Sequence, residues 1–293
     1  MKAAFLPDRG VIKISGADAR HLLNGLVTTD LTLLKPGLGR FGALLTPQGK
    51  IVADFLITES AAADDGGFLI DCPKALAQPL ADKLKFYKLR AKVLIENLSD
   101  RLGVLAAWGG APAETPELAF ADPRHDDLGW RIIVPELLAQ KTAAAIGAEL
   151  VDVAAYEAHR IACGAPAGGV DFAYGDAFPH ESNMDRLHGV DFGKGCYIGQ
   201  EVVSRMHHRG TARTRIVRVL LDGAGPEAGA EIIAGEKPVG TMGSSVDGRG
   251  LALLRIDRVA DARDASLPIS AGGITLRLAD PDELKPITRR TVA

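Results

Sequence analysis

The strand pattern that begins near residue 211 constrains the fold more than any other feature of the sequence. From there onward the chain consists of short apolar runs separated by Gly and Asp turns, among them RIVRVLL, AEIIAG, LALLRI and ITLRL. Short strands with this spacing are typical of a small β-barrel or sandwich. We therefore predict a domain boundary near residues 209–213 and a C-terminal β-barrel over residues 209–293.

The part of the chain before this boundary mixes strands with helices. Runs of β-branched and aromatic residues predict strands at 11–14, 51–58, 68–71, 92–96, 103–108 and 129–134. Apolar residues at helical spacing predict helices over 136–147 and 153–162, and a third that begins at Pro73. Such a mixture predicts an α+β fold.

The stretch GLGRFG at residues 37–42 matches the GxGxxG pattern of dinucleotide-binding proteins. That pattern indicates dinucleotide binding only where it follows a strand and opens a helix. Here Pro36 precedes it, and the apolar run after it ends at Pro47. We interpret the stretch as part of a β-hairpin rather than a Rossmann turn.

Composition narrows the class of protein. The 293 residues carry a formal net charge of −3, so no global field draws the chain to nucleic acid or to an anionic membrane. The sequence has no apolar run of about 18 residues, which a membrane span would require. Three cysteines without a CxxC pair favour a reducing compartment, and the N-terminal sequence has no targeting pattern. We therefore expect a soluble cytoplasmic protein with no membrane partner.

Histidines on both sides of Cys196 raise the question of a metal site: His180, His188 and the pair His207–His208. Adjacent residues of a strand point to opposite faces, and HESNMDRLH lacks the i, i+4 pair of a helical metal site. No spacing supplies the four converging ligands of a structural zinc site. We predict no metal held by the protein.

Five arginines gather at the predicted domain boundary, namely Arg205, Arg209, Arg213, Arg215 and Arg218. They fit a solvated strand face with ion pairs between domains. They also fit an anion-binding site, because guanidinium groups grip carboxylates and phosphates bidentately. Both alternatives stay open. With one aromatic residue nearby and no RNP-like motif, we expect no nucleic-acid partner.

The octapeptide KGCYIGQE places Cys196 between two glycines and close to Lys194. The lysine would favour the thiolate, and a helix beginning at Gln200 would act in the same direction through its N-terminus. A buried inert cysteine fits the composition equally well. Residue chemistry therefore leaves four roles open: nucleophile, metal ligand, redox sensor or small buried side chain.

Three segments together resemble the signature of the YgfZ-type folate-binding proteins: PHESNMD, GVDFGKGCYIGQEVVSR and HHRG, within residues 179–210. These proteins are relatives of the glycine cleavage T-protein and of mitochondrial iron–sulfur assembly factors. Residues 16–34 and 46–58 are similar to the opening segment of the family, so the resemblance covers most of the chain.

The resemblance implies a T-protein-like cloverleaf of two α+β folate-binding units plus a C-terminal β-barrel, with tetrahydrofolate in a central hole. The first unit would join residues 1–45 to 155–208, and the second would span 46–154. The resemblance also implies a factor that supports assembly or repair of [4Fe–4S] clusters, with folate and iron–sulfur client or assembly proteins as partners. It does not imply turnover.

The resemblance further implies a set of site residues. Cys196 would be the functional thiol, and Glu181 falls where the T-protein has a folate-binding glutamate. Asp54 falls on one of a pair of acids used in aminomethyl transfer, but Ala53 replaces the other. The remaining folate-binding candidates are Asn183, Lys194, Tyr197, Gln200, Glu201 and Arg205. Alternative functions are a folate-dependent aminomethyltransferase and a folate-linked tRNA-modification component.

Overall fold

The computed structural model describes residues 1–61, 66–210 and 212–284. By its internal contacts the chain divides into two compact units. The first unit comprises Met1–Pro47, Ile51–Tyr156 and Leu187–Ile198. The second comprises Gln48–Lys50, Glu157–Arg186 and the residues from Gly199 onward. Each unit is described by itself below.

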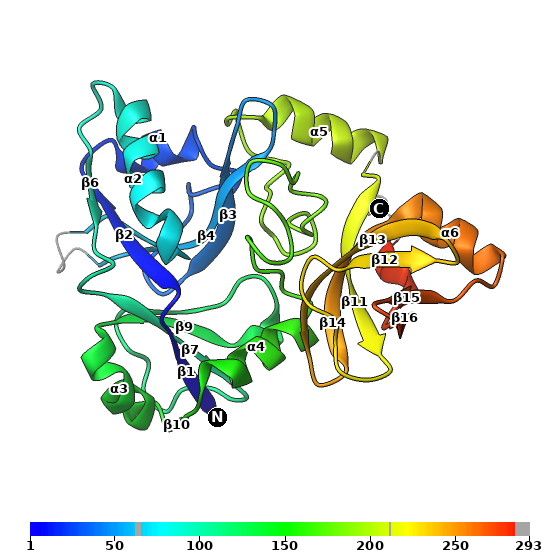
Figure 1. The fold of residues 1–293 in the computed structure, drawn as a ribbon. Helices are drawn as coiled ribbons and strands as arrows, with labels where there is room; N and C mark the ends of the chain where they lie inside the picture. Colours follow the sequence, from blue (N-terminus) through cyan, green and yellow to red (C-terminus); the bar gives the residue numbers. More distant parts are fainter. Residues whose placement is uncertain (62–65, 211, 285–293) are drawn as a thin grey trace, which may run out of the picture. The chain divides into compact units, whose positions relative to one another are not determined.

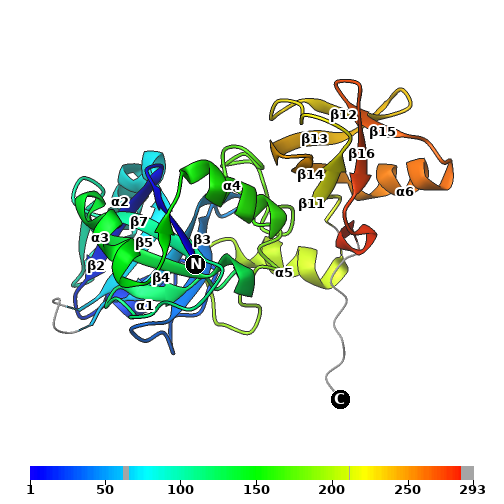
Figure 2. The same ribbon diagram turned by 90° about the horizontal axis from the view of Figure 1, so that it is seen from below.

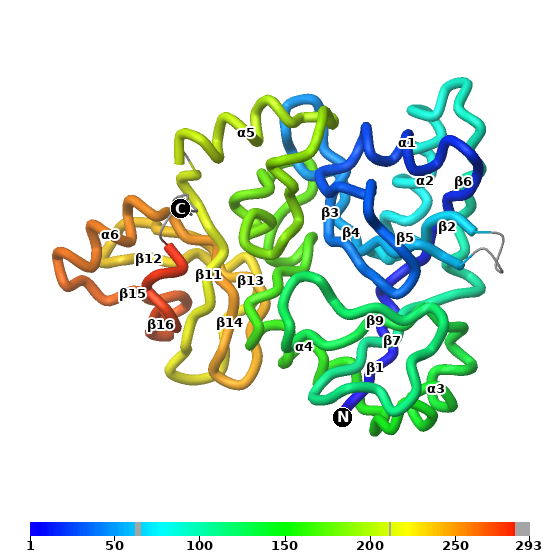
Figure 3. Tube along the Cα trace, turned by 180° about the vertical axis from the view of Figure 1, so that it is seen from behind, coloured from blue at the N-terminus to red at the C-terminus, as the bar shows by residue number. Residues whose placement is uncertain are grey.

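The first unit contains two five-stranded sheets. One has the order β3-β4-β5-β2-β6, with β3 Gly39–Leu45, β4 Ile51–Glu59, β5 Phe68–Pro73, β2 Arg9–Ser15 and β6 Leu94–Asn97. The other has the order β10-β1-β7-β9-β8, with β10 Glu149–Leu150, β1 Lys2–Leu6, β7 Gly103–Trp108, β9 Trp130–Val134 and β8 Ala119–Ala121. Figure 3 shows the traces of β3, β4 and β5 running side by side.

Helix α2 (Lys74–Lys88) covers one face of the first sheet, together with the short α1 (Ala19–Asn24) (Figure 1). The apolar side of α2 carries Ala77, Leu80 and Leu84, which pack with Phe55 and Ile70 of the sheet. Pro79 lies within α2 and does not end the helix. Burial of this stripe, rather than helix propensity, is what holds α2 in place.

The second sheet packs against α3 (Ala139–Ala145) through a smaller core. Ala143 of the helix belongs to the same buried apolar cluster as the strand residues Leu105 and Ile132. A 3-10 turn at Glu136–Leu138 leads into α3. Helix α4 (Val153–Ala162) follows β10 in the chain.

The second unit contains a closed six-stranded barrel, shown in Figure 2 with helix α6 (Ile256–Asp264) beside it. The strands follow the order β11-β14-β13-β12-β15-β16, with β11 Thr214–Leu221, β14 Arg249–Arg255, β13 Lys237–Val246, β12 Glu231–Ala234, β15 Ile269–Ala271 and β16 Ile274–Leu278. Val217, Ile232 and Leu254 fill its interior. Helix α5 (Gln200–Arg209) precedes β11 in the chain.

The segment after α4 is tied to the barrel by one buried acid. Asp171 Oδ1 accepts the backbone N–H of Ser244 at 2.6 Å, and its Oδ2 accepts from Arg160 at 3.1 Å. Arg160 also donates to the Ser244 hydroxyl at 2.7 Å. Asp171 and Arg160 are each 4% exposed, so the two buried charges neutralise each other.

Several sequence predictions are confirmed. The barrel strands, the helix over 153–162, and the pairing of residues 51–58 with 68–71 are all present. Residues 39–42 form the first half of β3, which pairs with β4 as a hairpin. The helix expected over 136–147 is shorter, because its first residues form the 3-10 turn. The proposed division into three units stays a prediction.

We predict that Asp171→Ala lowers the free energy of unfolding by about 3 kcal/mol, because the substitution leaves the Ser244 N–H without its buried acceptor and leaves Arg160 with only the more exposed carboxylate of Glu157. Urea titration followed by circular dichroism measures this loss. Asp264→Ala, at an exposed position of α6, is the matched control and should change the value by less than about 0.5 kcal/mol. A loss below about 1 kcal/mol for Asp171→Ala would contradict the assigned role.

Candidate functional site

The site residues predicted from the sequence divide between the two units. Asp54, Lys194, Cys196 and Tyr197 belong to the first unit. Glu181, Asn183, Gln200, Glu201 and Arg205 belong to the second. The chain passes from one unit to the other between Ile198 and Gly199, inside the KGCYIGQE motif.

Cys196 is exposed in the loop that precedes α5. The other two thiols are less accessible. Cys72 is buried in the core under α2, and burial raises the pKa of its thiol to about 12. Cys163 is half-buried, with its Sγ 3.8 Å from His159 Nε2. Cys196 is therefore the thiol that a partner can reach.

Lys194 anchors the loop that carries Cys196. Its ammonium donates to the backbone carbonyls of Asn24, Val27 and Thr29 at 2.8, 2.7 and 2.9 Å. An ammonium has three donors, so these bonds use all of them. Burial lowers the pKa of Lys194 to about 8, and the group stays mostly charged at neutral pH. Lys194 is expected from the sequence to stabilise the Cys196 thiolate. Its ammonium is instead hydrogen-bonded to backbone carbonyls.

Two further bonds join the same segments. The Thr28 hydroxyl donates to the Gly189 carbonyl at 2.6 Å, and the Asp191 N–H donates to the Thr28 carbonyl at 2.9 Å. Tyr197 buries its ring, whose centroid lies 5.4 Å from Lys194 Nζ. Burial raises the pKa of the Tyr197 phenol. The side chains of Lys194 and Tyr197 thus hold the base of the loop. The Cys196 thiol lies outside this base.

Asp54 lies on β4 and is 6% exposed. Its neighbours Ala53 and Phe55 belong to the core under α2, so Asp54 lies on the opposite face of the sheet. Burial alone would lower the pKa of Arg9, but the charge of Asp71 and, after it, that of Asp54 raise it. The acid expected from the T-protein resemblance is therefore buried among charged groups.

These groups form a charged cluster that joins the two sheets of the first unit, and it consists of Arg9, Asp71, Asp122, Arg124 and Arg131. Arg9 Nε lies 2.5 Å from Asp71 Oδ1, and Arg131 bridges Asp71 at 3.5 Å and Asp122 at 3.1 Å. Burial alone would raise the pKa of Asp122, but Arg124 and Arg131 hold it well below its usual range. The sequence prediction missed this cluster, although a charged residue inside an apolar strand, as in FLID and WRIIV, is a usable signal.

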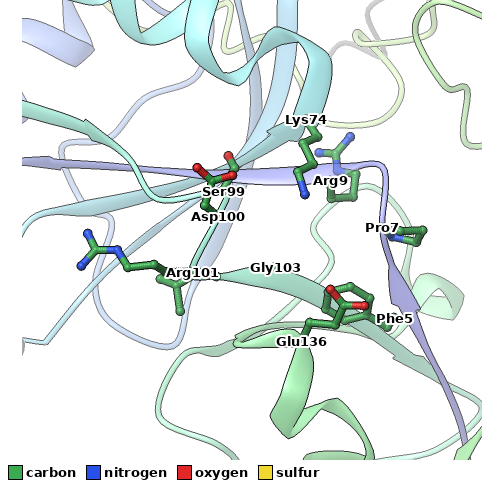
Figure 4. Close-up of a pocket in the computed structure, with 10 residues that line it drawn as sticks. Phe5, Pro7, Arg9, Lys74, Ser99, Asp100, Arg101, Gly103 and Glu136 are labelled. Carbon is green, nitrogen blue, oxygen red and sulfur yellow. The ribbon is translucent and has the colours of Figure 1, made fainter.

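A polar cavity of about 230 Å³ lies in the first unit beside this cluster (Figure 4). Figure 4 shows the Lys74 ammonium and the Glu136 carboxylate on opposite sides of the space. Arg9, Ser99 and Asp100 complete much of the polar wall. None of the predicted site residues lines this cavity, and its mixed charges select no single class of ligand.

Glu181 connects the loop before α5 to the first barrel strand. One carboxylate oxygen accepts from the Phe178 N–H at 2.8 Å, and the other accepts from the Thr214 hydroxyl at 2.5 Å. Its carbonyl accepts from Ile216 N–H at 2.9 Å. Each carboxylate oxygen has a second lone pair, so the side chain retains capacity for a ligand.

Asn183 has both ends of its amide engaged in the fold. Its Nδ2 donates to the Ile216 carbonyl at 2.7 Å, and its Oδ1 accepts from Arg215 at 3.0 Å. Its φ of 60° lies in the left-handed region, which Asn tolerates better than most residues. Arg215 is fully buried and forms a bidentate pair with Asp185, both contacts being 3.0 Å. Arg215 thus forms an ion pair, but it is buried rather than solvated, and its partner Asp185 belongs to the same unit.

Helix α5 begins at Gln200, as predicted, after Gly199 at a φ of 80°. Glu201 and Arg205 form an i, i+4 ion pair on its exposed side. The described residues contain no group of three or more His, Cys, Asp or Glu side chains close enough to hold a metal ion. No helix in the described ranges has the length and apolar character of a membrane span.

We predict that His180 makes folding stability pH-dependent. His180 is 3% exposed, and burial lowers its pKa to about 4; Arg215 and His207 act in the same direction, while Asp185 opposes them. The unfolded chain therefore binds the proton more readily, and stability present above about pH 6.5 is lost as the pH falls toward 4. Urea titrations should show wild type losing about 3 kcal/mol more than His180→Gln between pH 7 and pH 4. An equal loss in both proteins would contradict the assignment.

Comparison with known proteins identifies the class first. Residues 8–131 match the family described as "GCVT N-terminal domain", and residues 213–286 match "CAF17, C-terminal beta-barrel domain". The crystal structure of the glycine cleavage system aminomethyltransferase T from Bartonella henselae superposes with a TM-score of 0.72 at 17% identity, covering 96% of this chain and 85% of that one. The chain has a T-protein-like α+β fold with a CAF17-type barrel, which confirms the predicted fold class.

Sequence relatives identify the family. The chain is 33% identical over 293 residues to the mitochondrial iron–sulfur cluster assembly factor IBA57 homolog of Pyricularia oryzae, covering 91% of this chain and 75% of the relative. It is 31% identical over 281 residues to mitochondrial IBA57 of Mus musculus, covering 87% and 77%. The homolog from Mycosarcoma maydis is 38% identical over 228 residues, a match that spans 74% of this chain and 56% of that relative. The chain belongs to the IBA57 family of iron–sulfur cluster assembly factors.

The expected cytoplasmic location is wrong, because these relatives are named mitochondrial proteins. The expectation rested on the cysteine usage and on the N-terminal sequence, which folds into strands β1 and β2. A targeting segment is separate from the folded domain, so strands of the domain carry no information about the compartment.

Proposed function

We propose that the chain is a tetrahydrofolate-binding factor that supports assembly or repair of [4Fe–4S] clusters in client enzymes, and that it belongs to the YgfZ-type branch of its family. The observation that carries this proposal is the exposed Cys196 on a loop fixed by Lys194. The names of the relatives support the iron–sulfur part. The T-protein-like fold supports the folate part.

The chemistry of the thiols suggests how the chain would take part. Iron–sulfur clusters are held by several cysteine thiolates, usually four. This chain offers one exposed thiol, since Cys72 is buried with a raised pKa and Cys163 is half-buried beside His159. We propose that Cys196 supplies one ligand to a cluster whose other ligands come from a partner. The cluster is then cargo shared between two proteins.

The folate part of the proposal rests on Glu181. Its carboxylate has one donor on each oxygen and accepting capacity left, which suits the amino and ring N–H groups of a pterin. Aminomethyl transfer is less well supported, because Ala53 replaces one acid of the T-protein pair and Asp54 is buried. Folate would therefore act as a bound cofactor.

We predict that Cys196→Ala abolishes rescue of [4Fe–4S] enzyme activity in cells that lack the gene, because it removes the one thiol that is exposed among the described residues. Cys163→Ala is the matched control and should restore activity to within about twofold of wild type. The measurement is the activity of a [4Fe–4S] dehydratase in extracts, with protein levels compared by immunoblot. Full rescue by the Cys196 variant would refute a role for the thiol.

We predict that Glu181→Gln weakens tetrahydrofolate binding at least tenfold, because a neutral amide replaces a charge-assisted acceptor. Titration calorimetry measures the dissociation constant, and Glu227→Gln at an exposed position is the control. Equal binding by wild type and Glu181→Gln would remove this contact from the proposal. No binding by wild type would remove folate altogether.

A further inference from the structure

The end of helix α2 carries a concentration of positive charge. Residues 83–92, called the basic segment below, read KLKFYKLRAK and hold five cations and no acid, although the whole chain has a net charge of −3. Lys85, Arg90 and Lys92 are exposed, and the other two cations are half-buried. A local patch of this kind attracts anionic partners even when the net charge of the chain is negative.

Nearby acids neutralise only part of this charge. Asp82 lies 3.4 Å from Lys85 in an exposed pair, and such pairs contribute little. Asp18 accepts the backbone N–H of Lys92 at 2.7 Å. Glu96, the next acid along the chain, is half-buried on β6. The positive charges outnumber the negative ones even when all three acids are counted.

Two large apolar side chains of the basic segment are exposed to solvent. Phe86 is 76% exposed and Leu89 is 85% exposed. They lie three residues apart, which is about one helical turn. The Phe86 ring makes an edge-to-face contact with Tyr87, with centroids 5.7 Å apart, and Tyr87 packs against the core under α2. The Phe86 ring is therefore supported at the surface.

Leu89 has an unfavourable backbone conformation as well as an exposed side chain. It directly follows the last residue of α2 and has a φ of 46° and a ψ of −107°. A positive φ is disfavoured for leucine, whereas glycine adopts it freely and commonly follows the end of a helix. The leucine also leaves most of its apolar surface in water, which is unfavourable. Strain of this kind is retained mainly at functional sites.

Two exposed apolar side chains among five cations fit a protein partner best. Protein interfaces combine an apolar centre with a polar rim, and opposite charges speed association. Nucleic acid fits less well, because leucine cannot stack on a base and Arg90 supplies the one guanidinium of the segment. A lipid surface fits less well, because the apolar face of α2 is buried in the core and cannot insert.

We propose that the basic segment docks an acidic protein that shares the iron–sulfur cluster with Cys196, and that Phe86 and Leu89 enter an apolar pocket of that protein. That the partner carries a cluster rests on the proposed function. The basic segment and Cys196 belong to the same compact unit, so the unit that binds the partner also carries the thiol. Glutathione is small and needs no docking surface to deliver a cluster. Docking and cluster ligation can therefore be tested separately.

Two double variants, called the docking variants, test this surface in cells that lack the gene. Phe86→Ser/Leu89→Gly removes the apolar pair, and glycine suits the backbone that follows α2, so the fold is retained. Lys85→Glu/Arg90→Glu reverses two exposed charges. Each should lower the rescued activity of a [4Fe–4S] dehydratase at least fivefold at equal protein level. Full rescue by either variant would overturn the docking surface and leave the proposed function intact.

Matched controls lie in the same unit. Leu137→Ser alters a leucine that is 84% exposed, and Lys141→Glu reverses an exposed cation of α3. Both should rescue the activity as well as wild type does; a fivefold loss in either would overturn the assignment to the basic segment.

Anaerobic uptake of a glutathione-coordinated cluster separates docking from ligation. The docking variants should take up the cluster to within twofold of wild type. Loss of uptake by folded docking variants would overturn a role in docking. Failure of wild type to take up the cluster would overturn ligation by Cys196, while the rescue experiment would still decide whether the basic segment is needed.

Other occupants are distinguished with the purified chain. Vesicles with equal parts of phosphatidylglycerol and phosphatidylcholine test a lipid surface, single-stranded RNA tests nucleic acid, and gel filtration tests a second copy of the chain. Saturable binding to any of these that Lys85→Glu/Arg90→Glu abolishes would overturn the acidic protein partner. In rescued cells, photo-reactive benzoylphenylalanine in place of Phe86 should give a protein adduct that Lys85→Glu/Arg90→Glu removes. The absence of an adduct, or its persistence after charge reversal, would also overturn the proposal.

Discussion

Three hydrogen bonds from the Lys194 ammonium to backbone carbonyls hold the loop on which the proposed chemistry depends. A loop with an exposed thiol gains little stabilising free energy from burial of apolar surface. Polar contacts at its base must therefore hold it in position. Lys194 supplies them, and the buried ring of Tyr197 packs beside it. The cost of burying the ammonium is visible in its lowered pKa. The base of the loop is thus held by polar contacts, and Cys196 is exposed outside it.

The same constraint, that a buried charge must be paired, shapes the rest of the molecule. In the first unit the charged cluster joins the two sheets through Asp71, Arg131 and Asp122. In the second unit the Asp171–Arg160 pair connects the segment after α4 to the barrel, and the Asp185–Arg215 pair connects the loop before α5 to β11. Each of these pairs links elements that are distant in the sequence. Apolar packing alone would specify the relative position of those elements less uniquely.

Local patterns were sufficient to predict the barrel strands, the helix over 153–162 and the hairpin of β3 and β4, because each depends on neighbouring residues. Long-range polar contacts were not predictable in this way. Lys194 is close to Cys196 in sequence, yet its partners lie about 165 to 170 residues away. The amide of Asn183 is likewise engaged by Arg215 and Ile216, which its motif does not reveal. The motif indicated a resemblance at the level of the family, while only the structure showed what each side chain contacts.

Cluster capture tests whether Cys196 supplies one ligand to a shared cluster. A glutathione-coordinated [2Fe–2S] cluster, incubated anaerobically with the chain, provides the remaining thiolates. We expect cluster absorbance to co-elute with wild type and with Cys163→Ala in gel filtration, and Cys196→Ala to elute without it. Retention of the cluster by folded Cys196→Ala would show that the thiol is not a ligand.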